Sequence, residues 1–575
     1  MSDTLIPSSP PAKPFKEEVS RGSAWQLAKY ALVGLLFFVV LLALLGLVTA
    51  NSAAGTRSTS AVDYATNTIT LTLSSEPPQL NSTRSTDMVS GMVLGHVMEG
   101  LLRFGPDNNL IPGIAESWEL DELGGTFRIR SDAYWSNGTQ VTAHDFVFAW
   151  QTAVNPETAS QYAFILFPIK NGQRINEGEL PIEELGARAL DDFTLEVELE
   201  QATPYFLKLL AFFTYYPINK EFYLSTGGRY GADAEDLIYN GPFRIASWVH
   251  GASVRLEKNE YYWNRDETKL DAIDFAYILN DANAVLNLFA TRKIVFAGLN
   301  SENLDRALKN RWRIQEHVDG SVFFLELNHR PDRLTSNYNL RKALQLVHDP
   351  AELVYKVMKL PGNLPGESIF PVWLRGVHGS FRDEYPGPRF VQDEVKAREH
   401  LAMALDELGL DELPPLMFLT GDNPVSNKQS EYYQRLYKEK LGIEVKIDKQ
   451  IFKQRLAKMT SGDFDIVAAG WGPDYDDVLT FGDLFASWNA NNRGRYENPE
   501  LDKHVAIAQS SSDPVERMEA MDQVQKILHD DVAILVQYER GSVYVSDSRV
   551  KGVSRRAVGT DPDYTRAYIV QEENE

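Results

Sequence analysis

An aspartate that follows a buried apolar run is the residue best placed for chemistry in this sequence. Residues 464–475 read FDIVAAGWGPDY, an apolar half typical of a strand and then glycines and a proline that end it. Asp474 thus stands just past the strand, where a carboxylate could hold a cation in a cleft. Because Asp476 and Asp477 follow, a solvated acidic loop is the simpler alternative. A calcium loop of the EF-hand type is disfavoured, since its Gly at position six and Glu at position twelve are missing.

The elements around Asp474 alternate between strand and helix patterns. We expect strands and helices in turn at 416–420, 429–441, 443–447, 451–459 and 464–469. This order favours a parallel sheet with right-handed crossovers. Ligands bind such sheets beyond the carboxyl ends of the strands, and Asp474 lies at such an end.

The first half of the chain is richer in strands. Alternating polar and apolar residues predict strands at 69–73, 126–130, 194–199 and 253–257, the first of them half-buried. Thr142 is expected to cap a helix, with Asp145 reaching back to it as in a capping box. Asp513 and Pro514 are expected to start another helix. The two halves together predict an α/β protein.

The composition is that of a large acidic chain without cysteine. A chain of 575 residues is too long for one ordinary hydrophobic core, so two or three lobes are expected. A formal net charge of −23 argues against a nucleic-acid-binding protein, because binding to nucleic acid depends on clustered Lys and Arg. The charge fits solubility or attraction for cationic ligands. The lack of cysteine excludes disulfides, thiol catalysis, Cys-ligated metals and a lipid anchor on cysteine.

An apolar run near the N-terminus is long enough to cross a membrane. Residues 30–48 are almost all apolar, close to the about 20 that a spanning helix needs. Basic residues precede the run and none follows until Arg57, so the N-terminus is expected in the cytoplasm and the bulk outside the inner membrane. We expect a disordered tail (1–28), a retained single-pass anchor (29–50) and a tether (51–66). A long cleavable signal is the alternative.

Nothing in the sequence supports catalysis. Walker A, dinucleotide-binding, zinc-protease and Ser-hydrolase motifs are all missing. The ten histidines are scattered, and His329 and His348 are most simply packing or surface residues. We therefore expect a binding protein, with no enzymatic activity, no cofactor and no metal.

Three blocks of the sequence, taken in order, are specific to one family. They are AESW (115–118) with YWSNG (134–138) and VTAHDF (141–146), NGPF (240–243) with NEYYW (259–263), and GWGPDY (470–475) with RYENPELD (495–502). Over about residues 68–570 the chain resembles the peptide- and oligopeptide-binding receptors of bacterial ABC importers, the large three-subdomain periplasmic solute-binding proteins. The resemblance implies a bilobal fold that closes on its ligand by a hinge motion.

The resemblance also implies how the chain is divided. The first lobe would take residues 67–324, with an extra subdomain at 88–220. The second lobe would run over 325–540 and contain the parallel sheet. Residues 541–575 would return to the first lobe.

In the family, the acidic residue at the place of Asp474 pairs with the α-ammonium of a peptide. Trp471 would line the pocket, and Gly470 and Gly472 would leave backbone groups open for strand-like pairing with an extended peptide. Phe452 stands where relatives often carry an aromatic over the ligand. Further candidate ligand-binding residues are Glu76 in the opening segment, Asn240 in the second block, and Arg540 as a possible carboxylate contact.

One departure bears on the ligand. Relatives that clamp the carboxylate of a peptide use arginines near the positions of Met459 and Ala468, and this chain has neither. Longer or modified peptides, or another amine-bearing ligand, therefore stay open.

The expected partners are a peptide, the permease subunits of an ABC importer with separate ATPase chains, and the membrane. Two alternatives remain at this point. One is a peptide sensor or chaperone, and the other is a receptor for a non-peptide solute on the same scaffold.

Overall fold

The computed structural model describes residues 25, 29–30, 32–34, 60–106 and 109–571. The chain separates into two compact units, 1–57 and 58–575, and the second is the subject below. Within the described residues, no helix has the length and apolar character needed to span a membrane. The expected tail and anchor lie outside the described residues, apart from the few just named between 25 and 34.

The largest sheet has seven strands and contains the predicted parallel unit. Its order is β12-β18-β13-β17-β15-β16, and β14 pairs with β18. The strands are β12 (Phe296–Leu299), β13 (Ile314–Leu327), β14 (Leu364–Pro365), β15 (Leu416–Gly421), β16 (Val445–Gln450), β17 (Ile466–Trp471) and β18 (Ile534–Ser546). β15 runs parallel to both β16 and β17, which confirms the predicted parallel arrangement.

Helices join these parallel strands as the sequence predicts. α13 (Pro424–Leu441) connects β15 to β16, and α14 (Phe452–Ser461) connects β16 to β17. α13 starts five residues before the predicted position 429, because Asn423 caps it and Pro424 occupies its first turn. It ends at Gly442, whose φ of 73° is the left-handed value that glycine adopts most easily.

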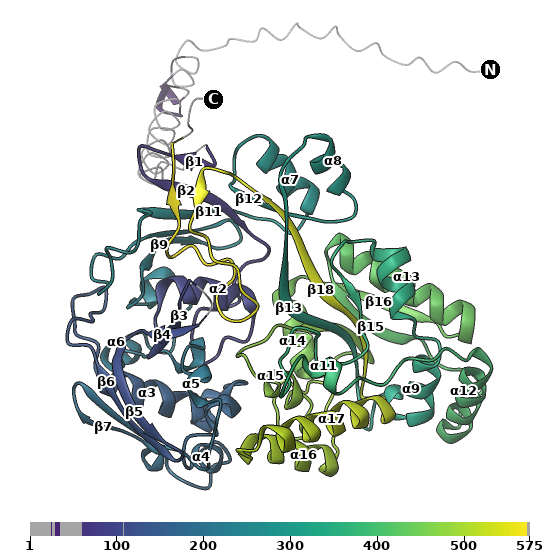
Figure 1. Ribbon diagram of the computed structural model, residues 1–575. Coiled ribbons are helices and arrows are strands. Elements are labelled where there is room, and N and C mark those ends of the chain that lie inside the picture. The colour runs from purple at the N-terminus through teal and green to yellow at the C-terminus, as the bar shows by residue number, and fades with distance from the viewer. Residues whose placement is uncertain (1–24, 26–28, 31, 35–59, 107–108, 572–575) are drawn as a thin grey trace, which may run out of the picture. The chain divides into compact units, whose positions relative to one another are not determined.

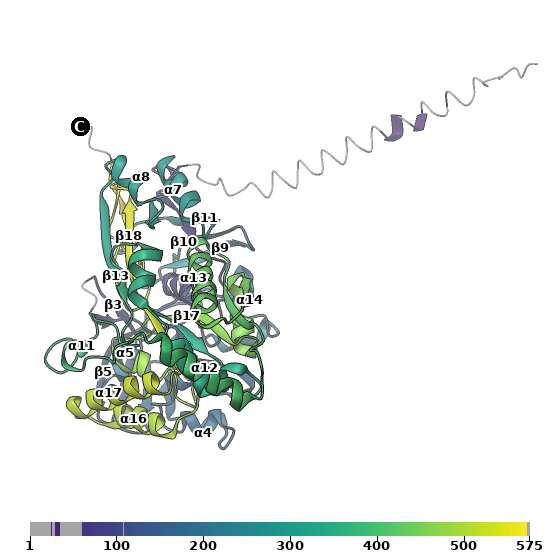
Figure 2. The ribbon, with the colours of Figure 1, turned by 90° about the vertical axis from the view of Figure 1, so that its right-hand side faces the viewer.

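Two long antiparallel strands run through the molecule side by side. β13 and β18 pair from Ile314↔Val545 to Glu326↔Ile534, with irregularities near the middle of β13. Figures 1 and 2 both show them as neighbouring ribbons, teal and yellow, from the α7 and α8 end to the end near β15. They therefore connect two regions of the protein through one long ladder, whose register shifts between Val318 and Val322.

A second sheet has five strands, in the order β1-β2-β11-β10-β9. These are β1 (Val62–Asp63), β2 (Thr68–Leu73), β9 (Phe243–Val249), β10 (Ser253–Lys258) and β11 (Ala272–Ile278). β2 was expected to be half-buried, but Thr68 and Thr70 are as fully buried as Ile69, so the half-burial is wrong. The alternation misleads here because packing covers both faces of the strand.

A third sheet of four strands follows the order β5-β6-β8-β7. Its strands are β5 (Ala115–Asp121), β6 (Gly124–Ile129), β7 (Ala187–Asp191) and β8 (Thr194–Glu198), and two-stranded ladders join β3 (Leu102–Phe104) to β4 (Leu110–Pro112) and β19 (Val550–Lys551) to β20 (Tyr568–Ile569). α3 (Ala143–Val154) packs against β7, and the capping box is confirmed by the bond from the Thr142 N–H to Asp145 Oδ2 (2.9 Å).

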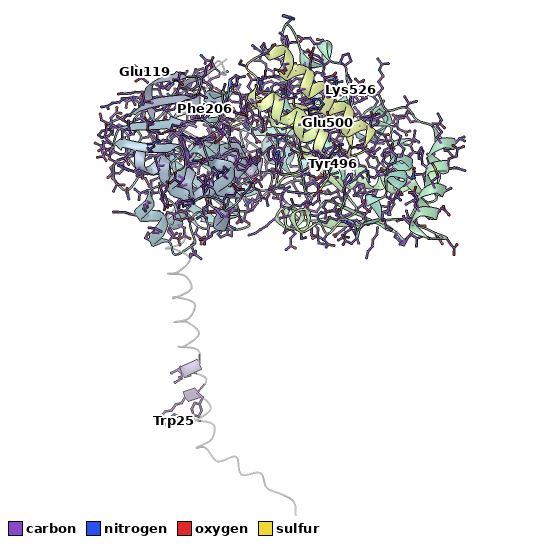
Figure 3. All side chains as sticks on the ribbon, turned by 90° about the horizontal axis from the view of Figure 1, so that it is seen from below. Trp25, Glu119, Phe206, Tyr496, Glu500 and Lys526 are labelled. Atoms are coloured by element: carbon purple, nitrogen blue, oxygen red, sulfur yellow. The ribbon has the colours of Figure 1, made fainter. Side chains whose placement is uncertain are left out.

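The other α-helices lie between or beside these strands in the sequence. They are α2 (Met88–Val97), α4 (Gly172–Asn176), α5 (Phe206–Leu209), α6 (Lys220–Ser225), α7 (Ala282–Ala290), α8 (Leu304–Lys309), α9 (Tyr338–Gln345), α10 (Pro350–Glu352), α11 (Phe381–Glu384), α12 (Glu394–Leu408), α15 (Leu479–Gly482), α16 (Pro499–Ser510) and α17 (Pro514–Asp530). α17 begins as predicted, with Asp513 as its cap and Pro514 in its first turn. α16 and α17 lie side by side, and Figure 3 labels Glu500 on the first and Lys526 on the second.

Candidate functional site

Asp474 lies in the loop between β17 and α15, just past the carboxyl end of β17 as expected. Its backbone N–H donates to the Thr480 hydroxyl at 2.8 Å, which fixes the loop. Its Oδ1 accepts a hydrogen bond from the Tyr162 hydroxyl at 2.9 Å. Tyr162 comes from the segment after α3, so two parts of the chain far apart in sequence meet at this carboxyl group.

The surroundings of Asp474 favour its neutral form. Burial raises the pKa of the Asp474 carboxyl well above its usual value, and only the Tyr162 hydrogen bond acts against this. In the described part of the chain, no Lys, Arg or His forms a salt bridge with it. A cationic group placed here would favour the ionised carboxylate, to which the described residues supply no counter-charge.

Aromatic side chains surround the Tyr162–Asp474 pair. The ring of Tyr162 contacts Trp471 (6.0 Å between centroids) and lies edge-on to Phe212 (5.1 Å). The indole Nε1 of Trp471 is buried without a hydrogen-bond partner among the described residues. A buried indole N–H normally finds a partner, so this donor is available to a bound molecule.

The backbone next to Trp471 has one open side. β17 pairs with β13 over its whole length, but with β15 only at Ile466 and Val467. Beyond Val467 the two parallel strands separate, and the Ala468 carbonyl accepts from Arg455 Nη1 at 3.0 Å instead. Residues 469–471 therefore present a stretch of β17 to which no strand of the described chain pairs on the β15 side.

The two predicted glycines make close approaches. A Cβ on Gly470 would lie 2.7 Å from the Phe323 ring on β13. A Cβ on Gly472 would lie 3.0 Å from Met88 Sδ on α2 and 3.5 Å from the Ser321 hydroxyl. Arg540 is close to the same atoms, since its Nη2 donates to Ser321 Oγ at 3.2 Å and its guanidinium lies over the Phe323 ring. Arg540 and both glycines thus belong to one cluster with Trp471.

Of the other predicted residues, Phe452 lies at the border of the site, and Asn240 and Glu76 lie outside it. Phe452 begins α14 and lies under the Arg455 guanidinium (5.6 Å). The Asn240 side chain is buried, accepts from the Glu99 N–H at 3.0 Å and donates to the Glu99 carbonyl at 2.8 Å. Glu76 accepts from His250 Nδ1 (2.6 Å) and from the Gly251 N–H (2.8 Å). The hydrogen bonds of Asn240 and Glu76 therefore lie outside the Asp474 cluster.

Sequence reasoning missed three charged residues at this site. Arg493 is 7% exposed and donates from Nη2 to the Gln161 side chain at 3.1 Å. Glu326 on β13 is buried beside it and accepts from the Gly494 N–H. Arg455 on α14 is the third. The polar run 491–495 was the only sequence signal for Arg493, and nothing in it points to Gln161.

Metal binding receives no support from the described residues, which contain no group of three His, Asp or Glu side chains suited to an ion. The site is instead a cluster of the Asp474 carboxyl group, aromatic rings, an open strand edge and three arginines, Arg455, Arg493 and Arg540.

Comparison with known proteins decides the family. Residues 109–493, more than half of the chain, match the bacterial extracellular solute-binding proteins, family 5. The chain belongs to this family. It is therefore a solute-binding protein of the extracytoplasmic type and not an enzyme, as the three sequence blocks predicted. The family resemblance inferred from those blocks is confirmed.

Individual relatives agree over most of the chain. The oligopeptide-binding protein OppA of Bacillus subtilis is 33% identical over 505 residues, 86% of this chain and 91% of that protein. The substrate-binding domain of an oligopeptide ABC transporter from Bacillus anthracis superposes with a TM-score of 0.84 at 35% identity, over 88% of this chain and 99% of that one. Listeria monocytogenes OppA, solved with bound peptide, gives 0.82 at 31% identity, over 88% and 99%. The mixed α/β solute-binding fold is confirmed.

Proposed function

We propose that this protein binds peptides outside the cytoplasm and delivers them to an ABC importer, with Asp474 receiving the α-ammonium group. The observation that carries the proposal is the half-buried Asp474, whose carboxyl group has the Tyr162 hydroxyl as its only polar side-chain partner in the described chain. Relatives named as oligopeptide-binding proteins support the choice of a peptide as ligand.

The chemistry of the pairing favours an ammonium group. A ligand cation next to Asp474 stabilises the ionised carboxylate, which burial alone disfavours. A hydrogen bond to a charged group contributes about 1.5–3 kcal/mol net, more than a neutral one. Tyr162 can keep its own bond to Oδ1 while Oδ2 accepts from the ligand. One ammonium per peptide would then fix the register of the ligand.

The open edge of β17 supports a sequence-tolerant mode of binding. An extended peptide can pair with the backbone of residues 469–471, where β15 has diverged. Backbone pairing supplies affinity that does not depend on side-chain identity. The Trp471 indole N–H offers one more donor along this edge. Together with Asp474, these groups bind features that every peptide shares.

Closure of two lobes would exclude water from the ligand. We assign residues 67–324, with an extra subdomain at 88–220, to one lobe and 325–540 to the other, with 541–575 returning to the first. The proposed subdomain contributes Tyr162, Gln161 and Lys208, which bond across to Asp474, Arg493 and the Asp476 carbonyl respectively. A ligand that touches both sides biases the hinge towards this closed arrangement.

The N-terminal apolar run supports tethering to the membrane. Residues 30–48 match the length that a spanning helix needs, and the charge pattern places the solute-binding part outside. A retained anchor would keep the receptor at high effective concentration beside the permease subunits, whose partner chains hydrolyse ATP.

Native mass spectrometry of the full-length protein in detergent tests the proposed ligand class. The expected spectrum shows the protein with co-purified masses that fragment into peptides. Asp474→Asn should lose these masses, whereas Asp476→Asn, on the exposed neighbouring aspartate, should keep them. A sugar or a metal chelate in the wild-type spectrum would overturn the proposal.

A further inference from the structure

We propose that Tyr205, Tyr475 and Arg517 form a clamp between the two proposed lobes, which sets the fraction of ligand-free protein that is closed. The inference rests on the proposed function and its division into lobes, and adds a control of the same site by residues that bind no peptide. Tyr205 belongs to the proposed extra subdomain, whereas Tyr475 and Arg517 belong to the second lobe. One buried tyrosine is thus held by two residues of the other lobe.

The second lobe holds Arg517 in place by itself. Arg517 is on α17, where its Nη2 donates to Asp477 Oδ1 at 2.6 Å and its Nε donates to the Ala508 carbonyl at 2.8 Å. The side chains of Arg517 and Asp477 are 8% and 7% exposed, so the ion pair is shielded from water. Tyr475 is buried in the loop that also contains Asp477. The surface that receives Tyr205 is therefore built from one lobe and does not depend on closure.

Tyr205 completes the contact from the other lobe. Its ring stacks on that of Tyr475, with 5.7 Å between the centroids, and the Arg517 guanidinium carbon lies 5.4 Å from the centroid of the Tyr205 ring. Phe206 and Leu209 of α5 are buried and fix the tyrosine to the proposed subdomain, and Figure 3 labels Phe206. Stacked rings and a guanidinium next to a ring attract each other, more strongly where water is excluded.

The clamp side chains are covered by protein. Tyr205, Tyr475 and Arg517 are 4%, 3% and 6% exposed, which leaves no surface on them for a peptide. Separation of the lobes would return these surfaces to water, at a cost that is the same for every ligand. The clamp therefore stabilises the closed form independently of the peptide that is bound.

A second aromatic contact joins the same two parts of the chain. Trp488, in the segment after α15, lies against Phe164 (5.8 Å between centroids) and Phe167 (6.1 Å) of the proposed subdomain. Trp488 is only partly buried, in contrast to the clamp residues. The closed form is thus held in two places by contacts between protein side chains.

These contacts shift the equilibrium between open and closed forms before any peptide arrives. A ligand that binds only the closed form has an apparent affinity that is reduced by the closed fraction of the free protein. If the clamp favours closure by about tenfold, its loss should weaken the binding of every peptide by about fivefold to tenfold. The preference for a free amine should not change, because Asp474 still meets the same ammonium group.

Distances between two spin labels on the full-length protein in detergent test the clamp. The chain has no cysteine, so Glu119→Cys on β5 and Glu500→Cys on α16 provide the two labelling sites. Both positions are exposed, and Figure 3 labels both residues. Ligand-free wild type should show two distances, one of them equal to that of the protein saturated with trialanine. Tyr205→Ala should remove most of this closed component.

Three further variants make the result specific. Tyr205→Phe keeps the ring and should keep the closed component. Tyr134→Ala is the matched control, because it truncates an exposed tyrosine of the same proposed subdomain and should also keep the component. Trp488→Ala should reduce it, and the partial exposure of Trp488 makes this variant usable even if Tyr205→Ala does not fold.

Calorimetric titration with trialanine and N-acetyl-trialanine separates the clamp from the ammonium site. Tyr205→Ala should weaken the binding of both peptides by the same factor, about fivefold to tenfold. If the two affinities fall by different factors, Tyr205 acts by positioning Asp474 and the clamp is wrong.

The distance measurements also separate the clamp from the function that it rests on. The clamp is wrong if ligand-free wild type lacks the distance of the saturated protein, or if it shows that distance alone. It is also wrong if the closed component survives in both Tyr205→Ala and Trp488→Ala. If neither peptide binds wild type, the proposed function fails, whereas the loss of one of two ligand-free distances in these variants still decides the clamp.

Discussion

Tyr162 and Asp474 stand 312 residues apart in the sequence, yet the phenolic oxygen of one lies 2.9 Å from Oδ1 of the other. The bond links the segment after α3 to the loop after β17. It is the hydrogen bond that the Asp474 carboxyl group accepts, and the ring of its donor, Tyr162, contacts Phe212 and Trp471.

Tyr162→Phe should weaken peptide binding by about 1.5–3 kcal/mol, the range for a hydrogen bond to a charged acceptor. The Tyr162 bond lowers the pKa of Asp474, so its loss leaves less carboxylate at neutral pH. Binding of a free-amine tripeptide measured by calorimetry checks this. Tyr205→Phe is the control, because its ring stacks on Tyr475 (5.7 Å) and should keep doing so. Equal losses in both variants would contradict the assigned role.

Peptide binding should release a proton from Asp474. Burial raises the pKa of Asp474 in the free protein, so the carboxyl group is protonated to a higher pH than an exposed aspartate. An incoming ammonium favours the ionised form and lowers that pKa. Affinity should therefore rise with pH, until the α-amino group of the peptide, with a pKa of about 7.7–8.0, begins to lose its charge.

Titrations in two buffers of different ionisation enthalpy report this proton directly. Wild type should give different heats in the two buffers, and the difference should vanish in Asp474→Asn. Identical heats for wild type would show that the carboxyl group is already ionised before the peptide arrives.

Gly470→Ala should destabilise the fold. The added Cβ would lie 2.7 Å from the Phe323 ring, so either the ring or β17 must shift. Overpacking of this kind costs about 1–3 kcal/mol. Gly298→Ala on β12 is the matched control, since nothing lies within 4 Å of its added Cβ. Urea unfolding midpoints measure both. A Gly470→Ala protein as stable as Gly298→Ala would mean that Phe323 moves freely.

Glu326→Gln should change how stability depends on pH. Burial raises the pKa of Glu326 from 4.5 to about 7, so the folded state prefers the protonated form. That stabilisation is fully present below about pH 4.5 and is lost as pH rises through 7. The free energy of unfolding of wild type should therefore fall by about 3 kcal/mol relative to that of Glu326→Gln over this interval. Glu316→Gln, at an exposed position of β13, should follow wild type. If the free energies of unfolding of wild type and Glu326→Gln change with pH in parallel, then Glu326 is not held in its neutral form.

The helices and strands around Asp474 were predictable, because each depends on residues that are close together in the sequence. The periodicity of 416–469 predicts β15, α13, β16, α14 and β17, and it places Asp474 beyond the last strand. Asp513 and Pro514 predict the start of α17 for the same reason. Each of these patterns lies within a short stretch of the sequence.

The contacts that complete the site were not predictable, because they join distant segments. No local pattern pairs Tyr162 with Asp474 or Gln161 with Arg493. Sequence reasoning also noted that Met459 and Ala468 are not arginines, yet in the structure each contacts an arginine supplied from another position. Contacts of this kind depend on which segments fold together, so a residue-by-residue comparison of sequences does not reveal them.

The proposed role of Asp474 is to bind the α-ammonium group of a peptide. Its most direct test is the affinity of wild type for one tripeptide with a free amine and for the same tripeptide after N-acetylation. Acetylation should weaken binding by about 2–5 kcal/mol in wild type and should have little effect in Asp474→Asn. Equal affinities of wild type for the free and the acetylated peptide would contradict it.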